Sequence, residues 1–434
     1  SILIKSGARV DERTVDGGTP LLNASAAGWL ENVEILVMNG AEVDCATSTR
    51  VTPLFAACAI GCDKVVEFLL KCGANIDIST ALDGATPLFV ACQRGHESVV
   101  NILIRSGASI EKSTNDGASP LYIACLRGHS NVGELLVGNG SDVENGRTVD
   151  GTTPLQIACV NGHLKVVEIL IRKGAAVGRP RASDGATALH VASGNGHLDV
   201  IEALLRAGAD VDQISMLDGI SPLFVACIAG HTSVAEVLIR NGANIEVRTA
   251  TQGVTPLFAA CQRGHLSVVD LMIKNGADVN AVCTEYATNP LFISCMMGHV
   301  IVADVLIRNG AEIDMFRRSD GMTPLAIACF RGFQEIWRML ATRGGTVPDR
   351  WVSELKRSMR QVDCEEVNRM VEESERVQIE TKSKFPMIEA VKRGDIEEVR
   401  KMIEKGRKKM MMSGRRKKIE MERKDEEEKK TALE

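Results

Sequence analysis

Residues 84–96 read GATPLFVACQRGH, and residues 253–265 repeat them almost letter for letter as GVTPLFAACQRGH. A repeated building block explains such a recurrence more simply than a duplicated active site does. Aligning the chain on Thr-Pro-Leu and its close variants gives ten copies, each 33 or 34 residues after the last. The copies start at Thr19, Thr52, Thr86, Ser119, Thr153, Thr187, Ser221, Thr255, Asn289 and Thr323. The sequence is therefore a tandem array with one structural unit per copy.

Each copy opens with residues that favour the start of a helix. The Thr, Ser or Asn side chain can cap the first turn, and Pro suits the first helical position. Mostly apolar or small residues follow, as in Leu88 to Cys92, so we expect this first helix to be buried on most of its sides. A glycine nine residues after each start, such as Gly95, can adopt the left-handed conformation that ends the helix.

A second helix and a turn complete each copy. The stretch HESVVNILIRSG, residues 96–107, places its apolar residues on one stripe, which is typical of an amphipathic helix with an exposed flank. The next segment, ASIEKSTNDGA at residues 108–118, carries Asp-Gly near its end and predicts an extended turn or hairpin.

With their Thr-Pro-Leu opening, Gly-His joint and closing Gly-Ala, these residues resemble the ankyrin repeat. The resemblance covers residues 1–345, as a half repeat at Gly7-Ala8 and ten full repeats. It implies an all-α fold, an α-solenoid of stacked helix-turn-helix repeats joined by β-hairpin-like loops. The family's usual His after Leu is mostly Phe or Tyr here, with His190 as the exception. We therefore do not expect the family's histidine hydrogen bond in most repeats.

The rest of the chain divides into four predicted segments. Residues 346–384 are interpreted as a helical, degenerate repeat, and residues 385–406 as a further ankyrin-like repeat with Gly394 and Gly406 at the usual offsets. Residues 407–430 form a charged insertion, and residues 431–434, TALE, resemble the start of a truncated repeat. The chain begins without an initiator Met. We interpret both ends as cuts through repeats and expect a longer natural protein.

Composition and charge exclude several classes of function. With 45% hydrophobic and 25% charged residues and no apolar run of ~18 residues, the chain is typical of a folded protein without membrane insertion. Residues 1–345 hold 27 Lys+Arg and 35 Asp+Glu, whereas nucleic-acid binding requires a basic stripe. Residues 346–434 hold 24 and 21. The run Arg415, Arg416, Lys417 and Lys418 is either solvated chain or a nuclear import signal. We expect an intracellular protein, cytoplasmic or, through this run, nuclear.

Cysteine and histidine recur, but their spacing does not indicate catalysis. Eight of the thirteen Cys share one offset, seven of the eight His follow the helix-ending glycine, and six repeats place a Cys four residues before a His. A structural zinc site needs four ligands, whereas each copy offers two. We interpret the cysteines as reduced packing residues and the histidines as a recurring backbone contact. No phosphate-binding loop or nucleophile elbow is present, so we predict no enzyme, no cofactor and no metal.

The positions that vary between copies are the candidates for binding. The two residues before the helix-ending glycine change from copy to copy, and in proteins that this chain resembles they lie on a concave surface that holds a partner protein. Their mixture of Met, Phe, Leu, Ile and Arg is typical of interfaces. The candidates are Arg94, Arg127, Arg263, Met296, Met297, Phe330 and Arg331, with Tyr286 and Phe316 as anchors at loop tips and Met216, Leu217, Glu285 and Arg317 as secondary tip residues. The recurring Phe55, Phe89, Tyr122, Phe224, Phe258 and Phe292 are interpreted as core.

These observations predict a non-enzymatic scaffold or adaptor, a monomeric array that binds other proteins on its concave face and hairpin tips. The alternative is a recruiting or regulatory arm of a larger protein whose enzyme, ligase or channel part lies outside this sequence. The sequence does not identify the partner.

Overall fold

The computed structural model describes residues 9–285, 287–348, 350–352, 354 and 401. In these residues the regular secondary structure is entirely helical, without a strand. Twenty helices, α2 to α21, have their bounds among them, and residues 350–352, 354 and 401 are also helical. The chain divides into two compact units, residues 1–312 and 313–434. The all-α prediction is confirmed.

The first unit is a stack of nine helix pairs. The first helices of the pairs are α2 (Pro20–Ala26), α4 (Pro53–Ile60), α6 (Pro87–Arg94), α8 (Pro120–Arg127), α10 (Pro154–Val160), α12 (Ala188–Asn195), α14 (Pro222–Ala229), α16 (Pro256–Arg263) and α18 (Pro290–Met297). The second helices are α3 (Leu30–Met38), α5 (Asp63–Lys71), α7 (Glu97–Arg105), α9 (Ser130–Gly138), α11 (Leu164–Arg172), α13 (Leu198–Arg206), α15 (Thr232–Arg240), α17 (Leu266–Lys274) and α19 (Val300–Arg308). Each first helix packs on its own second helix, and each from α2 to α16 also packs on the first helix of the next pair.

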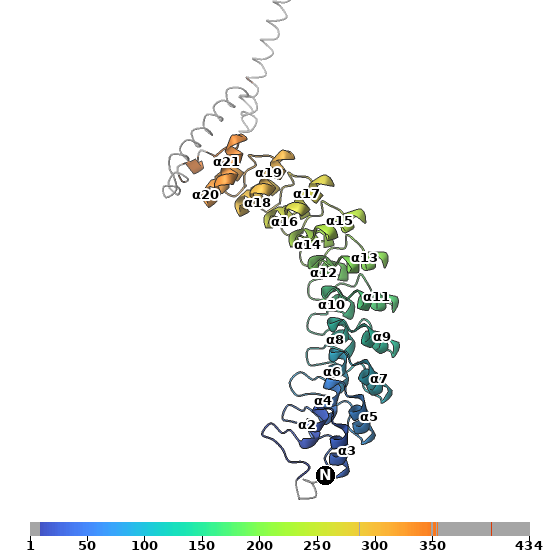
Figure 1. Ribbon diagram of the computed structural model, residues 1–434. Helices are drawn as coiled ribbons and strands as arrows, with labels where there is room; N and C mark the ends of the chain where they lie inside the picture. The colour runs from blue at the N-terminus through green and yellow to red at the C-terminus, as the bar shows by residue number, and fades with distance from the viewer. Residues whose placement is uncertain (1–8, 286, 349, 353, 355–400, 402–434) are drawn as a thin grey trace, which may run out of the picture. The chain divides into compact units, whose positions relative to one another are not determined.

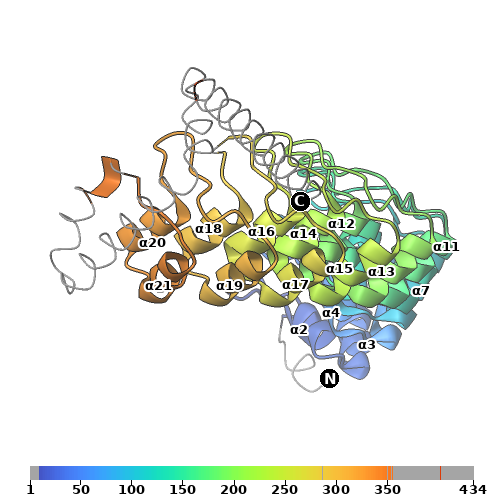
Figure 2. The same cartoon turned by 90° about the horizontal axis from the view of Figure 1, so that it is seen from above.

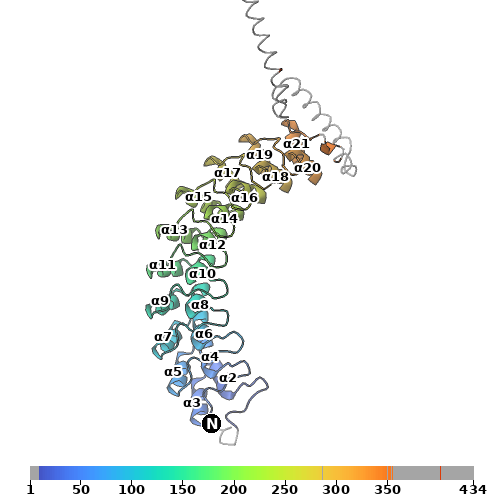
Figure 3. The ribbon, with the colours of Figure 1, turned by 180° about the vertical axis from the view of Figure 1, so that it is seen from behind.

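Two helical layers result from this packing. Within the first unit the even-numbered helices form the inner, concave layer and the odd-numbered helices the outer layer (Figure 1). The view from behind shows the same order (Figure 3). The layers follow from composition, because the first helices are apolar on most sides and the second helices carry one buried stripe, such as Val99, Val100 and Leu103.

The predicted helix starts and ends are found in most repeats of the first unit. The exceptions are Thr187, whose side chain makes no cap bond to the backbone of α12, and α2 and α10, whose C-caps are Ala27 and Asn161, one residue before the predicted glycine. The Ser119 hydroxyl accepts a hydrogen bond from the Tyr122 backbone N–H at 3.1 Å, and Gly128 ends the same helix with φ +76°. The same cap is made in this unit by Thr19, Thr52, Thr86, Thr153, Ser221, Thr255 and Asn289. Each satisfies a backbone N–H that the first helical turn would otherwise leave unpaired.

The inner helices form the core with the buried stripes of the outer ones. Phe89, Tyr122, Phe224, Phe258 and Phe292 are all buried, which confirms their interpretation as core, while Phe55 is half-buried. The eight cysteines that share one offset are buried as well: Cys58, Cys92, Cys125, Cys159, Cys227, Cys261, Cys295 and Cys329.

Loops between the helix pairs gather on one side of the helices (Figure 2). Each is closed like a hairpin; in one, the Thr114 backbone N–H donates to the Ala118 carbonyl at 3.0 Å. Neighbouring loops are also joined, because the Asn115 N–H donates to the Asp83 carbonyl of the preceding loop at 2.8 Å. The loops therefore form a linked wall beside the inner helices.

In the second unit the described residues form one further helix pair, α20 (Pro324–Arg331) and α21 (Gln334–Thr342). Thr323 caps α20, and the Thr346 N–H donates to the Asp314 carboxylate at 2.7 Å. Of the segments predicted beyond residue 345, residues 355–400 and 402–434 lie outside the described residues. The degenerate repeat, the further repeat, the charged insertion and the basic run at 415–418 therefore stay predictions.

A candidate protein-binding face

The joint histidines link neighbouring repeats. His129 directs Nε2 to the Gln93 carbonyl of the preceding repeat at 3.2 Å. The same bond recurs from His96 to Ala59, His163 to Leu126, His197 to Val160, His231 to Gly194, His265 to Ile228 and His299 to Gln262. A carbonyl only accepts, so Nε2 carries the proton in each bond. The predicted backbone contact is confirmed, and these rings hold neighbouring repeats together.

The buried cysteines are held in their neutral form. Burial raises the pKa of the Cys261 thiol to about 12, while the Ser294 hydroxyl acts in the opposite direction. Burial likewise raises the pKa of Cys92 and Cys125 far above the range in which a thiolate forms. A thiolate is the nucleophile and the metal ligand, so burial disfavours the form of these groups that would attack a substrate or bind a metal. No group of three or more His, Cys, Asp or Glu suited to a metal occurs among the described residues.

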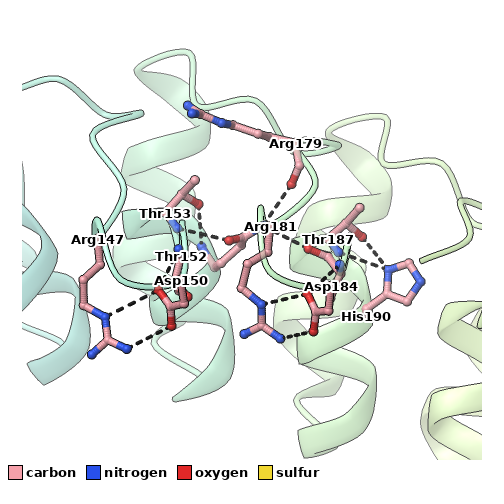
Figure 4. Close-up of polar contacts among 11 residues, drawn as sticks. Arg147, Asp150, Thr152, Thr153, Arg179, Arg181, Asp184, Thr187 and His190 are labelled. Carbon is pink, nitrogen blue, oxygen red and sulfur yellow. Dashed lines mark hydrogen bonds and ion pairs between the residues drawn. The ribbon is translucent and has the colours of Figure 1, made fainter. Parts of the chain in front are cut away.

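His190 occupies the position that is Phe or Tyr in most repeats. Its Nδ1 accepts from the Thr187 N–H at 3.2 Å and lies 2.8 Å from the Thr187 hydroxyl (Figure 4). Its Nε2 donates to the Ile220 carbonyl at 2.9 Å. Burial lowers the pKa of His190, and the Ile220 carbonyl and Asp184 oppose that shift. The neutral ring therefore completes the helix cap.

Gln156 makes the equivalent cap in the preceding repeat. Its Oε1 accepts from the Thr153 N–H at 3.0 Å, and its Nε2 donates to the Arg179 and Ala186 carbonyls at 2.9 and 3.1 Å. The sequence interpretation considered histidine alone and missed this residue. A glutamine three residues after a capping Thr is the signal that could have found it.

A groove runs between the inner helices and the loop wall of the first unit. It consists of two adjoining cavities of about 490 and 530 Å³, which share Val160 and Arg181. We call it the hairpin groove. Its helix side is lined by Phe89, Gln93, Tyr122, Ile123, Leu126, Ile157, Val160, His190, Val191, Gly194, Asn195 and Val225, and its loop side includes Asp83, Thr114, Asp116, Arg147, Asp150, Thr152, Arg181, Asp184, Leu217 and Asp218.

Arginine and aspartate pairs stiffen the loop side of the groove. Arg147 binds Asp150 through two nitrogens, at 2.9 and 3.4 Å, and Arg181 binds Asp184 in the same forked way (Figure 4). Burial would raise the pKa of Asp150, but hydrogen bonds from Arg147 and Thr152 outweigh it and hold the pKa at about 2. Such paired charges fix the loop and leave their arginines little capacity for a ligand.

The sequence interpretation missed these pairs, although the recurring Arg-x-x-Asp-Gly at residues 147–151, 181–185 and 317–321 marks them. The third copy bears on a predicted site residue, because Arg317 pairs with Asp320 of its own loop. The side chain of Arg317 is consequently occupied and only 23% exposed.

None of the predicted arginines lines the hairpin groove. Arg94 and Arg127 lie at its rim, whereas Arg263 is on α16, which contributes no lining residue, and Arg331 belongs to the second unit. Arg94 and Arg127 are the exposed last residues of α6 and α8, and Arg263 ends α16. None of the three forms an ion pair with another described residue. The residues just before Arg94 and Arg127, Gln93 and Leu126, do line the groove.

The predicted apolar candidates are exposed to different degrees. Met297 at the end of α18 is 44% exposed, and Met296 is half-buried. In the second unit Phe330 is 51% exposed and Phe316 is 62% exposed, while Arg331 is exposed at the end of α20. Met216 and Leu217 are exposed at a loop tip. Tyr286 lies outside the described residues. A binding role for these side chains stays a prediction.

None of the helices in the described residues is long and apolar enough to span a membrane.

Comparison with known proteins agrees with the repeat geometry. The family model described as ankyrin repeats (3 copies) matches residues 1–80, 77–146, 134–215, 212–283 and 280–350, so the chain belongs to the ankyrin-repeat family. Among solved structures, the human ASB11 ankyrin repeat domain is 31% identical, with a TM-score of 0.47 over 52% of this chain and 99% of that one. The search of curated proteins gives no match. Ankyrin repeats in general are protein–protein interaction modules.

Proposed function

We propose that this chain is a non-enzymatic scaffold or adaptor that binds other proteins on the concave side of the array, through the hairpin groove and the inner-helix ends. The observation that carries the proposal is the groove itself, an apolar floor beside a polar loop wall, with the exposed Arg94 and Arg127 at its rim. Apolar contact area with arginine at its edge is the usual composition of a protein interface.

The dimensions of the face support a protein as its ligand. Nine helix pairs stacked about 10 Å apart give the first unit an inner face of roughly 90 Å. A small substrate would be buried in one enclosed pocket, whereas the two cavities adjoin one another along the inner helices. The eight thiols that share one offset are buried, and the joint histidines are bound to backbone carbonyls, so we assign neither group a catalytic role.

Affinity capture from a cell lysate tests the proposal when concave and outer charges are reversed in parallel. The concave variant carries Arg94→Glu, Arg127→Glu, Arg263→Glu and Arg331→Glu. The control carries Lys71→Glu, Arg105→Glu, Arg206→Glu and Lys274→Glu, which end outer helices, are exposed and change the net charge equally. Circular dichroism first establishes that both variants fold like the native chain.

A partner that is retained by the native chain and the control but lost by the concave variant supports the concave face. If the two variants lose the partner equally, net charge and not this face determines binding. If both variants retain it, the inner-helix rim is not the binding surface and the proposal fails in this form.

A further inference from the structure

Tyr122 is a buried residue whose hydroxyl has no hydrogen-bond partner among the described residues. The residue is 4% exposed and lines the 490 Å³ cavity of the hairpin groove, and its hydroxyl makes no hydrogen bond with any described residue. Among the described residues, four polar side-chain atoms are sealed from solvent and lack a partner, and they belong to Ser25, Ser141, Ser193 and Trp337. The Tyr122 oxygen is not one of them, so it is open to the cavity. A ligand that enters from the groove can therefore bond to this oxygen.

The charged groups around Tyr122 determine the charge that such a ligand should have. The Arg147 guanidinium lies 5.9 Å from the ring centroid, but it is bound to Asp150 and lies 3.6 Å from Asp116. Arg181, the other cation that lines this cavity, is bound to Asp184. Both positive charges are therefore engaged with carboxylates of the loop wall.

Two carboxylates of the same cavity, those of Asp83 and Asp116, each have one oxygen that accepts no hydrogen bond from a described residue. Asp83 accepts from the Thr80 hydroxyl and the Ala85 N–H through Oδ1, and no hydrogen bond or ion pair involves Oδ2. Asp116 accepts from the Thr114 hydroxyl through Oδ1, while its Oδ2 has only the distant Arg147 contact. The open hydrogen-bonding capacity of the cavity is thus negative, beside an apolar floor.

We propose that this cavity binds a lysine or arginine side chain of an extended partner segment. The aliphatic stem lies along Phe89, Tyr122 and Leu126. The cationic head donates to the phenol oxygen, to Oδ2 of Asp83 and to Oδ2 of Asp116, which accepts no hydrogen bond and lies 3.6 Å from Arg147. A long basic side chain suits such a site because its stem is apolar and its head is charged. This inference rests on the proposed function and specifies the chemistry of its partner.

Fluorine NMR reads the site directly, because the chain has only two tyrosines, Tyr122 and Tyr286. The full chain is labelled with 3-fluorotyrosine, and Tyr286→Phe identifies the Tyr122 signal. The probes are a nonapeptide in which arginine alternates with alanine and a matched peptide with glutamate in place of each arginine. The arginine peptide is expected to shift the Tyr122 signal to saturation, with weaker binding at high salt, whereas the glutamate peptide leaves the signal unmoved.

Variants assign the contacts by fluorescence anisotropy of the labelled arginine peptide. Tyr122→Phe, which installs the residue found at this offset in five of the ten repeats, is expected to weaken binding about fivefold, the effect of one hydrogen bond. Asp83→Asn with Asp116→Asn is expected to weaken it at least as much. Asp16→Asn is the matched control, because Asp16 also accepts from a loop threonine, Thr14, but lies outside the groove.

The inference is overturned if the arginine peptide leaves the Tyr122 signal unmoved, if the glutamate peptide binds as tightly, or if Asp16→Asn weakens binding as much as the groove variants. Failure of the inference is distinguishable from failure of the proposed function. If only the inference fails, the concave arginine variant still loses its partner from the lysate. If the proposed function fails, that variant and its control behave alike in the lysate experiment, whatever the peptides do.

Discussion

His190 is the residue whose protonation has the clearest consequence for folding. Its folded pKa is lowered below 6.5 by burial, so the unfolded chain takes up a proton that the folded chain resists. Stability rises with pH wherever the unfolded state binds more protons. The contribution of the neutral ring is therefore complete above about pH 6.5 and is lost as the pH falls from there toward the folded pKa.

The variant His190→Gln tests this prediction, because Gln156 already makes the same cap without a titrating group. Between pH 7 and pH 5 the native chain should lose more stability than the variant, because only the native chain has a histidine at this position that binds a proton more readily when unfolded. Urea unfolding at each pH measures the difference. Parallel pH profiles for the two chains would show that His190 does not titrate between the folded and unfolded states.

Cysteine burial gives a second prediction at this scale. The eight cysteines that share one offset are buried, whereas Cys72 is exposed and Cys62 is intermediate. Burial raises the pKa of thiols at this offset, such as Cys125 and Cys261, and makes them inaccessible to reagents. Iodoacetamide should therefore label Cys72 before these two, and Cys125 and Cys261 only after unfolding. Peptide mass mapping of samples labelled with and without urea measures this order. Labelling of Cys125 as fast as Cys72 in the native chain would contradict it.

At the scale of the element, the joint between two helices explains why a glycine recurs. Gly128 has φ +76°, and a Cβ added there would lie 2.7 Å from the ring of His163. Gly140, at the end of the next helix, has φ +97° but nothing within 4 Å of an added Cβ. The first position therefore combines left-handed backbone with a packed histidine, and the second has the backbone requirement alone.

Alanine at these two glycines separates the two effects. Gly140→Ala should cost about 1 kcal/mol of unfolding free energy, the strain of a left-handed alanine. Gly128→Ala should cost at least about 1 kcal/mol more, because the His163 ring must move and its bond to the Leu126 carbonyl is at risk. Equal losses for the two variants in urea unfolding would mean that the ring contact contributes nothing to the joint.

Local signals allowed most of the elements to be predicted, because capping Thr, first-turn Pro and helix-ending Gly act within one turn. The histidine contact was also predictable, since its regular register indicated a shared structural cause. The hairpin groove was not. Its loop side depends on bonds between residues such as Arg147 and Asp150 within one loop, and its floor on Ile123 and Ile157, whose apolar character reads as core. Exposure at the rim, as for Arg94, followed from its place at a helix end.

At the scale of the first unit, each repeat contacts its neighbours and little else. α10 packs on α8, α12 and its own α11, and loop bonds such as Asn115 to Asp83 also connect adjacent repeats. Stability in such an array is close to a sum of repeat terms and nearest-neighbour terms. Damage to a central repeat should therefore weaken both flanking interfaces and leave distant repeats unaffected.

Leu155→Ala tests this nearest-neighbour behaviour, because Leu155 is 2% exposed in α10 near the middle of the first unit. Removing this side chain should lower the free energy of unfolding by about 2–5 kcal/mol, the range for a buried leucine replaced by alanine. Hydrogen exchange read by mass spectrometry should rise most in α10 and α11, less in the repeats on either side, and least in α2 and α18. Lys165→Ala, an exposed change in α11, is the control. A uniform rise from α2 to α18 would show instead that the nine pairs open as one cooperative body.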